Sequence, residues 1–134
     1  MNAFTDAEIR HMNRGLEATG PRPRHVNIEY LVRSWTHFVD EVESGYKLTI
    51  YDYTNDLSKR EILHELSEAV GPTLSARLEE VLRPVDERFR AASRALSRPV
   101  SRRECDEVLW WNFLIPTELH GELLEDLQRA GLLG

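Results

Sequence analysis

Residues 28–44 read IEYLVRSWTHFVDEVES, and this stretch decides the fold class. Apolar side chains recur along it at intervals of three and four residues, which is the spacing of one face of an α-helix. Asn27 can cap the start of a helix here, and Gly45 favours a left-handed turn at its end. The stretch predicts a helix over 28–44 whose core-facing residues are Ile28, Leu31, Val32, Trp35, Phe38, Val39 and Val42.

Helix-start signals recur on both sides of this stretch. In the pattern Ser/Thr-x-x-Glu/Asp, a hydroxyl and a carboxylate satisfy the free amides of a helix's first turn. The pattern occurs as Thr5 with Glu8, Thr49 with Asp52, Ser58 with Glu61, and Ser101 with Glu104. Each of these capping boxes predicts that a helix begins there.

The apolar stripes that follow these signals set the expected lengths of the helices. Pro84 interrupts one stripe without changing its face, which indicates a kinked helix. The residues just before Pro116 should be extended, and Pro116 can open a last helix. We expect helical segments after Thr5, over 28–44, over 50–56, over 58–70, over 73–96, through 105–111, and from Pro116 to Gly131.

The chain has no sustained alternation of apolar and polar residues and no internal repeat. Its 134 residues are close to the commonest size of one domain. We therefore expect an all-α fold, a single compact bundle of about five to six helices over 1–134. Residues 1–26 would form a loosely docked N-terminal helix and loop.

Composition and the first residues indicate where in the cell the protein is expected. It is 41% apolar and 30% charged, and no apolar run approaches the ~20 residues that a membrane span needs. The start, MNAFTDAEIR, lacks the basic end and apolar stretch of a secretory signal. The sequence therefore predicts a cytoplasmic protein with no membrane role. The single cysteine, Cys105, lies in a helical pattern and is expected to be a small buried thiol.

Charge varies along the chain, although 17 basic and 23 acidic residues give a net charge of only −6. Residues 28–70 hold nine acidic and four basic side chains, and 105–134 hold six acidic and one basic. Between them, 71–104 carries eight arginines and five acids. The acidic total argues against nucleic-acid binding. The sequence leaves open whether three arginines spaced four apart pair within the protein: Arg90, Arg94 and Arg98.

Two Glu-x-x-His pairs raise the possibility of a metal site. Glu8 with His11 and Glu61 with His64 have the spacing used by di-iron helical bundles. Both glutamates also belong to capping boxes, which places them at helix ends. The cap role is favoured, so we predict no metal and no cofactor. The chain also has no glycine-rich phosphate loop or nucleophile motif, and no catalytic residues are predicted.

Residues 45–61, GYKLTIYDYTNDLSKRE, combine tyrosines with acidic side chains. Tyrosine offers a broad contact area, and neighbouring carboxylates attract a basic partner. In the alternative interpretation, the tyrosines pack into the bundle and the aspartates serve helix starts. The predicted partner-binding residues are Tyr46, Tyr51, Asp52, Tyr53, Asn55 and Asp56, with Asp40, Glu41 and Glu43 extending the negative charge.

Three stretches carry a resemblance to a known class of proteins: GYKLTIYDYTNDLSKREIL at 45–63, RPVDERFRAAS at 83–93, and the pair Trp110-Trp111. Over most of residues 28–130 the chain resembles small acidic bacterial proteins of the actinomycete type. This resemblance implies an all-helical single domain and no particular activity. In size, charge and composition the chain is also similar to immunity and antitoxin proteins, which cover the site of a basic toxic enzyme with carboxylates and aromatic rings.

Three functional hypotheses follow. The leading one is a non-enzymatic cytoplasmic interaction module, of the immunity or antitoxin type, that binds a basic protein through the acidic, tyrosine-rich patch. The first alternative is a metal-dependent helical-bundle enzyme that uses the two Glu-x-x-His pairs. The second is a homodimer with Trp110, Trp111 and Phe113 at its interface, although three such aromatic residues are more often core than interface.

Overall fold

The computed structural model describes residues 3–101 and 104–133. The described residues contain five α-helices, one 3-10 helix and two short strands. In chain order these are α1 (Asp6–Thr19), α2 (Ile28–Ser44), α3 (Ile50–Ala69), α4 (Pro72–Ala91), β1 (Ser93–Ala95), η1 (Trp110–Phe113), β2 (Leu114–Pro116) and α5 (Gly121–Arg129). The predicted all-α class is confirmed, with the addition of a very small sheet.

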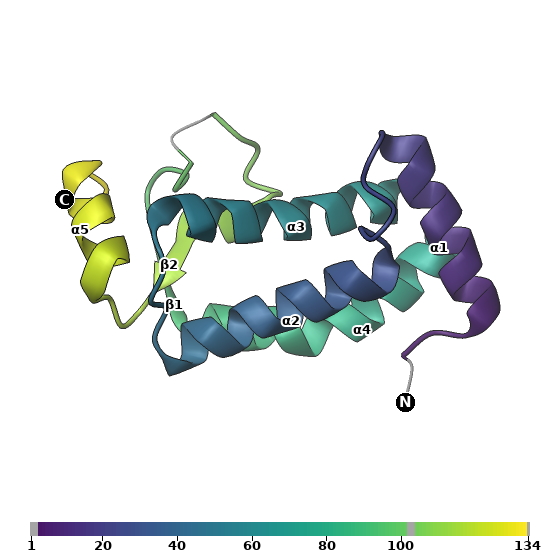
Figure 1. Ribbon diagram of the computed structural model, residues 1–134, viewed down its shortest axis with the longest axis horizontal. Helices are drawn as coiled ribbons and strands as arrows, with labels where there is room; N and C mark the ends of the chain where they lie inside the picture. Colours follow the sequence, from purple (N-terminus) through teal and green to yellow (C-terminus); the bar gives the residue numbers. More distant parts are fainter. Residues whose placement is uncertain (1–2, 102–103, 134) are drawn as a thin grey trace.

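Three long helices, α2, α3 and α4, run along the length of the molecule and form a bundle (Figure 1). Helix α1 crosses one end of this bundle, and α5 lies at the other end beside the strand pair. The first and last helices therefore lie at opposite ends of the bundle. Within the described residues, no helix combines the length and the apolar character needed to cross a membrane.

Local capping explains where three of the helices begin. The Thr5 hydroxyl accepts the Glu8 N–H at 3.1 Å, and a Glu8 carboxylate oxygen accepts the Thr5 N–H at 2.8 Å. Thr49 and Asp52 form the same reciprocal box, and Asn27 caps α2 by accepting the Tyr30 N–H. These three predicted starts are confirmed because a cap needs only neighbouring residues.

Two helix ends also match the sequence. Gly45 has a φ of +102°, and α2 ends before it. At the end of α5, Gly131 has a φ of +72°, its N–H donates to the Gln128 carbonyl, and the Leu132 N–H donates to the Leu127 carbonyl. This is the Schellman arrangement, and it brings Leu132 back onto the core.

Helix α3 corrects one predicted boundary. The sequence predicted a short helix over 50–56 and a new helix beginning at Ser58, whereas α3 is continuous from Ile50 to Ala69. The Ser58 hydroxyl donates to the Asn55 carbonyl within the helix and does not cap a new one. Buried Leu57 and Leu63 on either side keep the same helical face, so tertiary packing carries the helix through the apparent start signal.

Helix α4 continues through Pro84, as predicted, but ends earlier than expected. It stops at Ala91 and not near residue 96, because Ser93–Ala95 forms the strand β1. This strand pairs antiparallel with β2, with Ser93 opposite Pro116 and Ala95 opposite Leu114. The strand hydrogen bonds replace the helical ones that an alanine-rich sequence would otherwise form.

The chain between the strands corrects two more boundaries. The described residues 104–109 are not helical, and only η1 follows; the box at Ser101 lies beside residues outside the described part. Asp106 accepts the Val108 N–H with its side chain and the Leu109 N–H with its carbonyl, forming a turn. Helix α5 begins at Gly121 and not at Pro116, because Pro116 belongs to β2.

An aromatic cluster forms the centre of the core. The ring of Phe38 lies 5.3 to 5.6 Å from the rings of its four aromatic neighbours, measured between centroids, and most of these contacts are edge-to-face or tilted. Such ring pairs stabilise a core beyond the area that they bury. The neighbours come from α2, α4 and the α2–α3 connection as well as from α3: Trp35, Tyr46, Tyr53 and Phe89.

The N-terminal helix packs on the bundle through buried Met12 and Leu16. At Gly15, α1 approaches the end of α3 so closely that a Cβ atom there would lie 2.7 Å from Val70 Cγ1. The Asn13 side chain accepts the Ile28 N–H at 2.9 Å and ties α1 to the start of α2. The placement of residues 6–19 therefore depends on specific contacts with α2 and α3.

Candidate interaction site

The structure separates the three tyrosines of the predicted patch into a buried pair and one exposed residue. Tyr46 and Tyr53 are buried. The Tyr46 hydroxyl donates to an Asp56 carboxylate oxygen at 2.8 Å, and the Tyr53 hydroxyl donates to the Leu114 carbonyl at 2.7 Å. Their rings therefore belong to the core and not to a contact surface, which makes the exposed patch smaller than the sequence indicated. Tyr51, in contrast, is 82% exposed.

Burial raises the pKa of both core tyrosines. For Tyr53 burial alone holds the pKa of the hydroxyl well above its usual range. For Tyr46 burial is again the main cause, and the hydrogen bond to the Asp56 carboxylate raises the pKa further. Both hydroxyls stay protonated and keep donating at pH values where a solvated tyrosine ionises.

We expect the free energy of unfolding to fall as the pH rises above about 10, the usual tyrosine pKa. Above that pH the unfolded chain releases tyrosine protons that the folded chain keeps, so the unfolded state binds fewer protons and stability decreases. Below it this contribution is fully present. Urea unfolding at a series of pH values from about 8 to 11 measures the effect. The double variant Tyr46→Phe/Tyr53→Phe should show a shallower decrease, and an equal decrease would contradict this origin.

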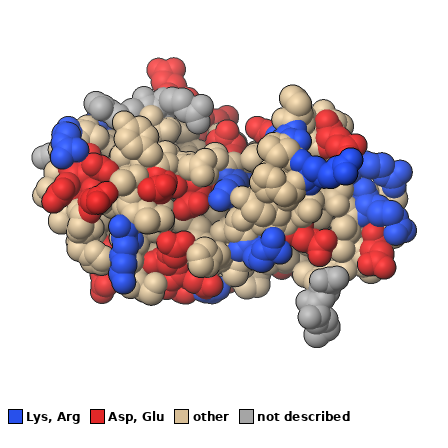
Figure 2. Space-filling view, in the orientation of Figure 1, with Lys and Arg blue, Asp and Glu red and all other residues tan. Residues whose placement is uncertain are grey.

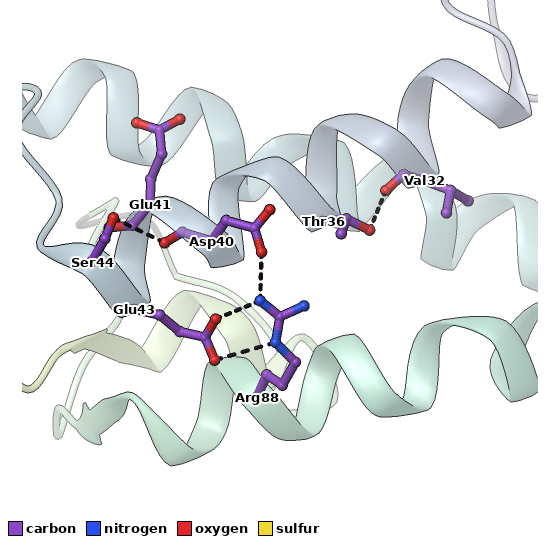
Figure 3. A network of polar contacts seen from close by, with 7 residues as sticks. All are labelled: Val32, Thr36, Asp40, Glu41, Glu43, Ser44 and Arg88. Atoms are coloured by element: carbon purple, nitrogen blue, oxygen red, sulfur yellow. Dashed lines mark hydrogen bonds and ion pairs between the residues drawn. The ribbon is translucent and has the colours of Figure 1, made fainter.

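The acidic side chains of α2 point in different directions. Asp40 and Glu43 both bind Arg88 of α4, whereas Glu41 lies away from α4 (Figure 3) and pairs with His37 at 3.1 Å. The hydrogen bond from Arg88 lowers the pKa of the Glu43 carboxyl. Asp40 and Glu43 are thus partly neutralised by Arg88, and exposed pairs of this kind contribute little to stability.

The first turn of α3 carries the exposed part of the predicted patch. Tyr51, Asp52 and Asn55 are all exposed, and neighbouring Leu48 is 43% exposed. The Asp52 carboxylate accepts the Thr49 hydroxyl at 2.8 Å and the Thr49 N–H at 3.2 Å. Its capping role fixes Asp52 in place, so it presents a positioned negative charge beside Tyr51.

A surface hollow of about 350 Å³ lies beside Tyr51, between the start of α3 and the end of α5. Asp126 of α5 holds the two elements together, because its carboxylate accepts the Ile50 N–H at 3.0 Å. The positive end of the α3 dipole also stabilises a carboxylate at this position. The residues that line the hollow are Ile50, Tyr51, Thr54, Val100, Ser101, Asp126, Arg129 and Ala130.

Charge is unevenly distributed over the surface. Acidic side chains are more frequent over the end of the molecule that holds α5 and the start of α3, and basic ones gather over the α1 end (Figure 2). Lys59 of α3 pairs with Asp56, and Arg129, which lines the hollow, pairs with Asp126. Among the described residues, no ion pair compensates the carboxylates of Glu118, Glu122 and Glu125. The α5 end therefore has an excess of negative charge.

The two Glu-x-x-His pairs that could have bound a metal do not come together, and most of their side chains contact other residues. Glu8 completes the α1 cap, which together with Arg77 lowers its pKa, and His11 is exposed. Glu61 accepts a long hydrogen bond, 3.5 Å, from the Asn112 amide. His64 pairs with Glu68 of its own helix at 3.4 Å. In the described part of the chain, no three His, Cys, Asp or Glu side chains are grouped so that they could hold a metal ion.

The aromatic residues of η1 are divided between core and surface. Trp111 is buried, whereas Trp110 and Phe113 are half-buried. Cys105 is also half-buried, so the expectation of a buried thiol is only partly met.

Sequence reasoning missed a buried ion pair between α3 and α4. Arg60 and Asp86 form a two-pronged pair with distances of 3.1 and 2.9 Å, and each side chain is only 10% exposed. The Trp35 indole N–H donates to the same carboxylate at 2.9 Å. The spacing of residues in the sequence did indicate that Asp86 is buried. Asp86 lies four residues after buried Leu82 and three before buried Phe89, which places it on the apolar face of α4.

No protein-family model, curated protein or solved structure matches the chain. Its fold and surface chemistry are therefore the basis for a functional proposal.

Proposed function

We propose that the protein is a cytoplasmic, non-enzymatic interaction module that binds a basic protein partner. The contact surface is the α3–α5 face, defined here as Tyr51, Asp52, Asn55, the hollow beside Tyr51 and the exposed acids of α5. The observation that carries the proposal is Tyr51, a large aromatic side chain that is 82% exposed at the edge of a hollow. Exposed tyrosines beside pockets are typical of the residues that dominate binding energy.

Charge determines the kind of partner. The hollow is lined by apolar side chains together with polar ones, and it lies at the acidic end of the molecule. It therefore suits an apolar or long basic side chain surrounded by lysines and arginines. Such charge complementarity speeds association and selects partners more than it adds affinity. A small basic enzyme of the kind that immunity proteins and antitoxins neutralise has this chemistry.

Selection of peptides from a displayed library tests the proposal. The wild-type protein should enrich peptides rich in lysine, arginine and an aromatic or long aliphatic residue. Tyr51→Ala should weaken a selected peptide by about fivefold or more, the effect of losing over 1 kcal/mol at a contact. Its stability should stay within about 0.5 kcal/mol of wild type because Tyr51 is exposed.

Two double variants with the same change in net charge distinguish binding at the α3–α5 face from non-specific attraction to the protein's negative charge. Glu122→Lys with Glu125→Lys changes the acidic end, and Glu17→Lys with Glu29→Lys makes the same charge change at exposed positions on α1 and α2. Only the first pair should abolish enrichment. Equal losses in both pairs, or full binding by Tyr51→Ala, would show that the α3–α5 face is not the contact surface.

A further inference from the structure

A second hollow, of about 450 Å³, lies between α3, α4 and η1. Its floor contains buried apolar side chains and the Arg60–Asp86 pair, and its rim contains exposed charged residues. This volume is within the range of small-molecule sites, which combine apolar walls with a few placed polar groups. The residues that the argument below uses are Arg60, Leu78, Leu82, Arg83, Asp86, Trp110 and Trp111, all of which line this α3–α4 cavity.

One buried donor and one further donor in the wall of the cavity have no acceptor among the described residues. The indole N–H of Trp111 is buried and makes no hydrogen bond within the described residues. Arg60 uses its Nε and one Nη2 hydrogen for Asp86, and its Nη1 makes no hydrogen bond to any described residue. The Arg60 guanidinium carbon lies 4.7 Å from the centre of the Trp111 ring, so the two side chains adjoin.

A buried donor without an acceptor, such as the Trp111 N–H, is uncommon and costly in folded proteins. A ligand could supply an acceptor for this N–H and for the adjoining Arg60 Nη1, and a carboxylate would also gain from the guanidinium charge. The Asp86 carboxylate repels such a ligand only weakly, because both of its oxygens already accept hydrogen bonds from the Arg60 guanidinium. The carboxylates of Glu79 and Glu87 are exposed at the rim, where solvent screens them.

The rim adds aromatic and cationic groups. The half-buried ring of Trp110 meets Trp111 edge-to-face at 5.5 Å, and the Arg90 guanidinium lies 3.8 Å from the centre of the Trp110 ring. Neither Arg83 nor Arg90 has an ion pair among the described residues. Planar and positively charged groups thus surround the entrance to an apolar floor.

We infer that the α3–α4 cavity binds a small planar organic carboxylate. The carboxylate accepts hydrogen bonds from Arg60 Nη1 and Trp111 Nε1, and the apolar body of the ligand packs on Leu78, Leu82 and the edge of Trp110. Arg83 attracts the anion at the entrance. This site involves a different part of the surface from the α3–α5 face and does not depend on the function proposed above.

Nuclear magnetic resonance of the indole N–H groups tests the inference, because the chain has only three tryptophans. The probes are benzoate, nicotinate and indole-3-acetate as planar carboxylates, benzamide as the neutral analogue, and inorganic phosphate. A planar carboxylate should shift the Trp111 resonance saturably, and the Trp35 resonance, which reports the hydrogen bond to Asp86, should move little. Benzamide should bind about tenfold more weakly than benzoate, as expected when a charge-assisted hydrogen bond becomes neutral.

Three variants complete the test. Trp111→Phe removes the N–H, keeps an aromatic ring and should reduce carboxylate affinity about tenfold, as measured from the Trp110 resonance. Arg83→Glu should also weaken binding severalfold, whereas Arg94→Glu makes the same charge change outside the cavity and should leave it unchanged. The inference is overturned if no planar carboxylate gives a saturable shift, if phosphate binds as well as the carboxylates, or if Arg94→Glu weakens binding as much as Arg83→Glu.

Discussion

Replacing Asp86 with alanine is expected to lower the free energy of unfolding by about 3–5 kcal/mol, the cost of leaving a buried charge without its partner. Asp86 accepts two hydrogen bonds from Arg60 and one from the Trp35 indole, and all three side chains lie between α2, α3 and α4. Removing the carboxylate leaves a buried guanidinium and an indole N–H without an acceptor. Urea unfolding followed by circular dichroism measures the loss.

Two further variants show whether the unpaired charge is the cause. Arg60→Met with Asp86→Leu removes both charges and leaves only the Trp35 N–H unsatisfied, so the loss should shrink to about 1–3 kcal/mol. Asp40→Ala removes an exposed carboxylate that binds Arg88 and should cost about 1 kcal/mol or less. A loss below about 1 kcal/mol for Asp86→Ala would mean that solvent reaches Arg60 and compensates it.

The second large effect is expected at Phe38, the aromatic residue with the most ring contacts in the core. Phe38→Ala should lower the free energy of unfolding by about 3–5 kcal/mol, because the cavity it leaves adjoins rings from α2, α3 and α4 that cannot all collapse into it. Denaturant unfolding gives the energy, and near-ultraviolet circular dichroism reports the loss of fixed aromatic packing.

Phe113→Ala is the matched control for this change, since Phe113 is only half-buried and its ring contacts no aromatic ring among the described residues. The same atoms are removed, so a smaller loss is expected from the smaller cavity. Equal losses at the two positions would mean that the cluster around Phe38 relaxes as freely as the surface does.

Local signals predicted the parts of the fold that depend on local chemistry. The caps at Thr5, Asn27 and Thr49 form because each needs only residues three positions away. Ser58 carries the same signal in the middle of α3, where packing of the helix on its neighbours prevails. Ser93–Ala95 has a helical composition, and its strand pairing with residues 114–116 cannot be inferred from neighbouring residues.

The candidate site was predicted only in part for a similar reason. Tyr51 and Asp52 are exposed and lie together, as the sequence indicated. Composition could not tell that Tyr46 and Tyr53 are buried, because a tyrosine suits both a core and a surface. The Arg60–Asp86 pair was missed because charged residues were assigned to solvated faces, and only their positions within the apolar stripes revealed them.

The two-stranded ladder also has a consequence for the tolerance of the chain to changes in length. Because β1 and β2 are paired directly, they form a stem that holds the end of α4 close to the approach to α5. Lengthening a loop above such a stem costs little, on the order of 0.6 kcal/mol for each doubling. Extra sequence inserted after the exposed Glu104 would therefore lengthen this loop and leave the helices where they are, which makes this position suitable for grafting a tag or a reporter domain.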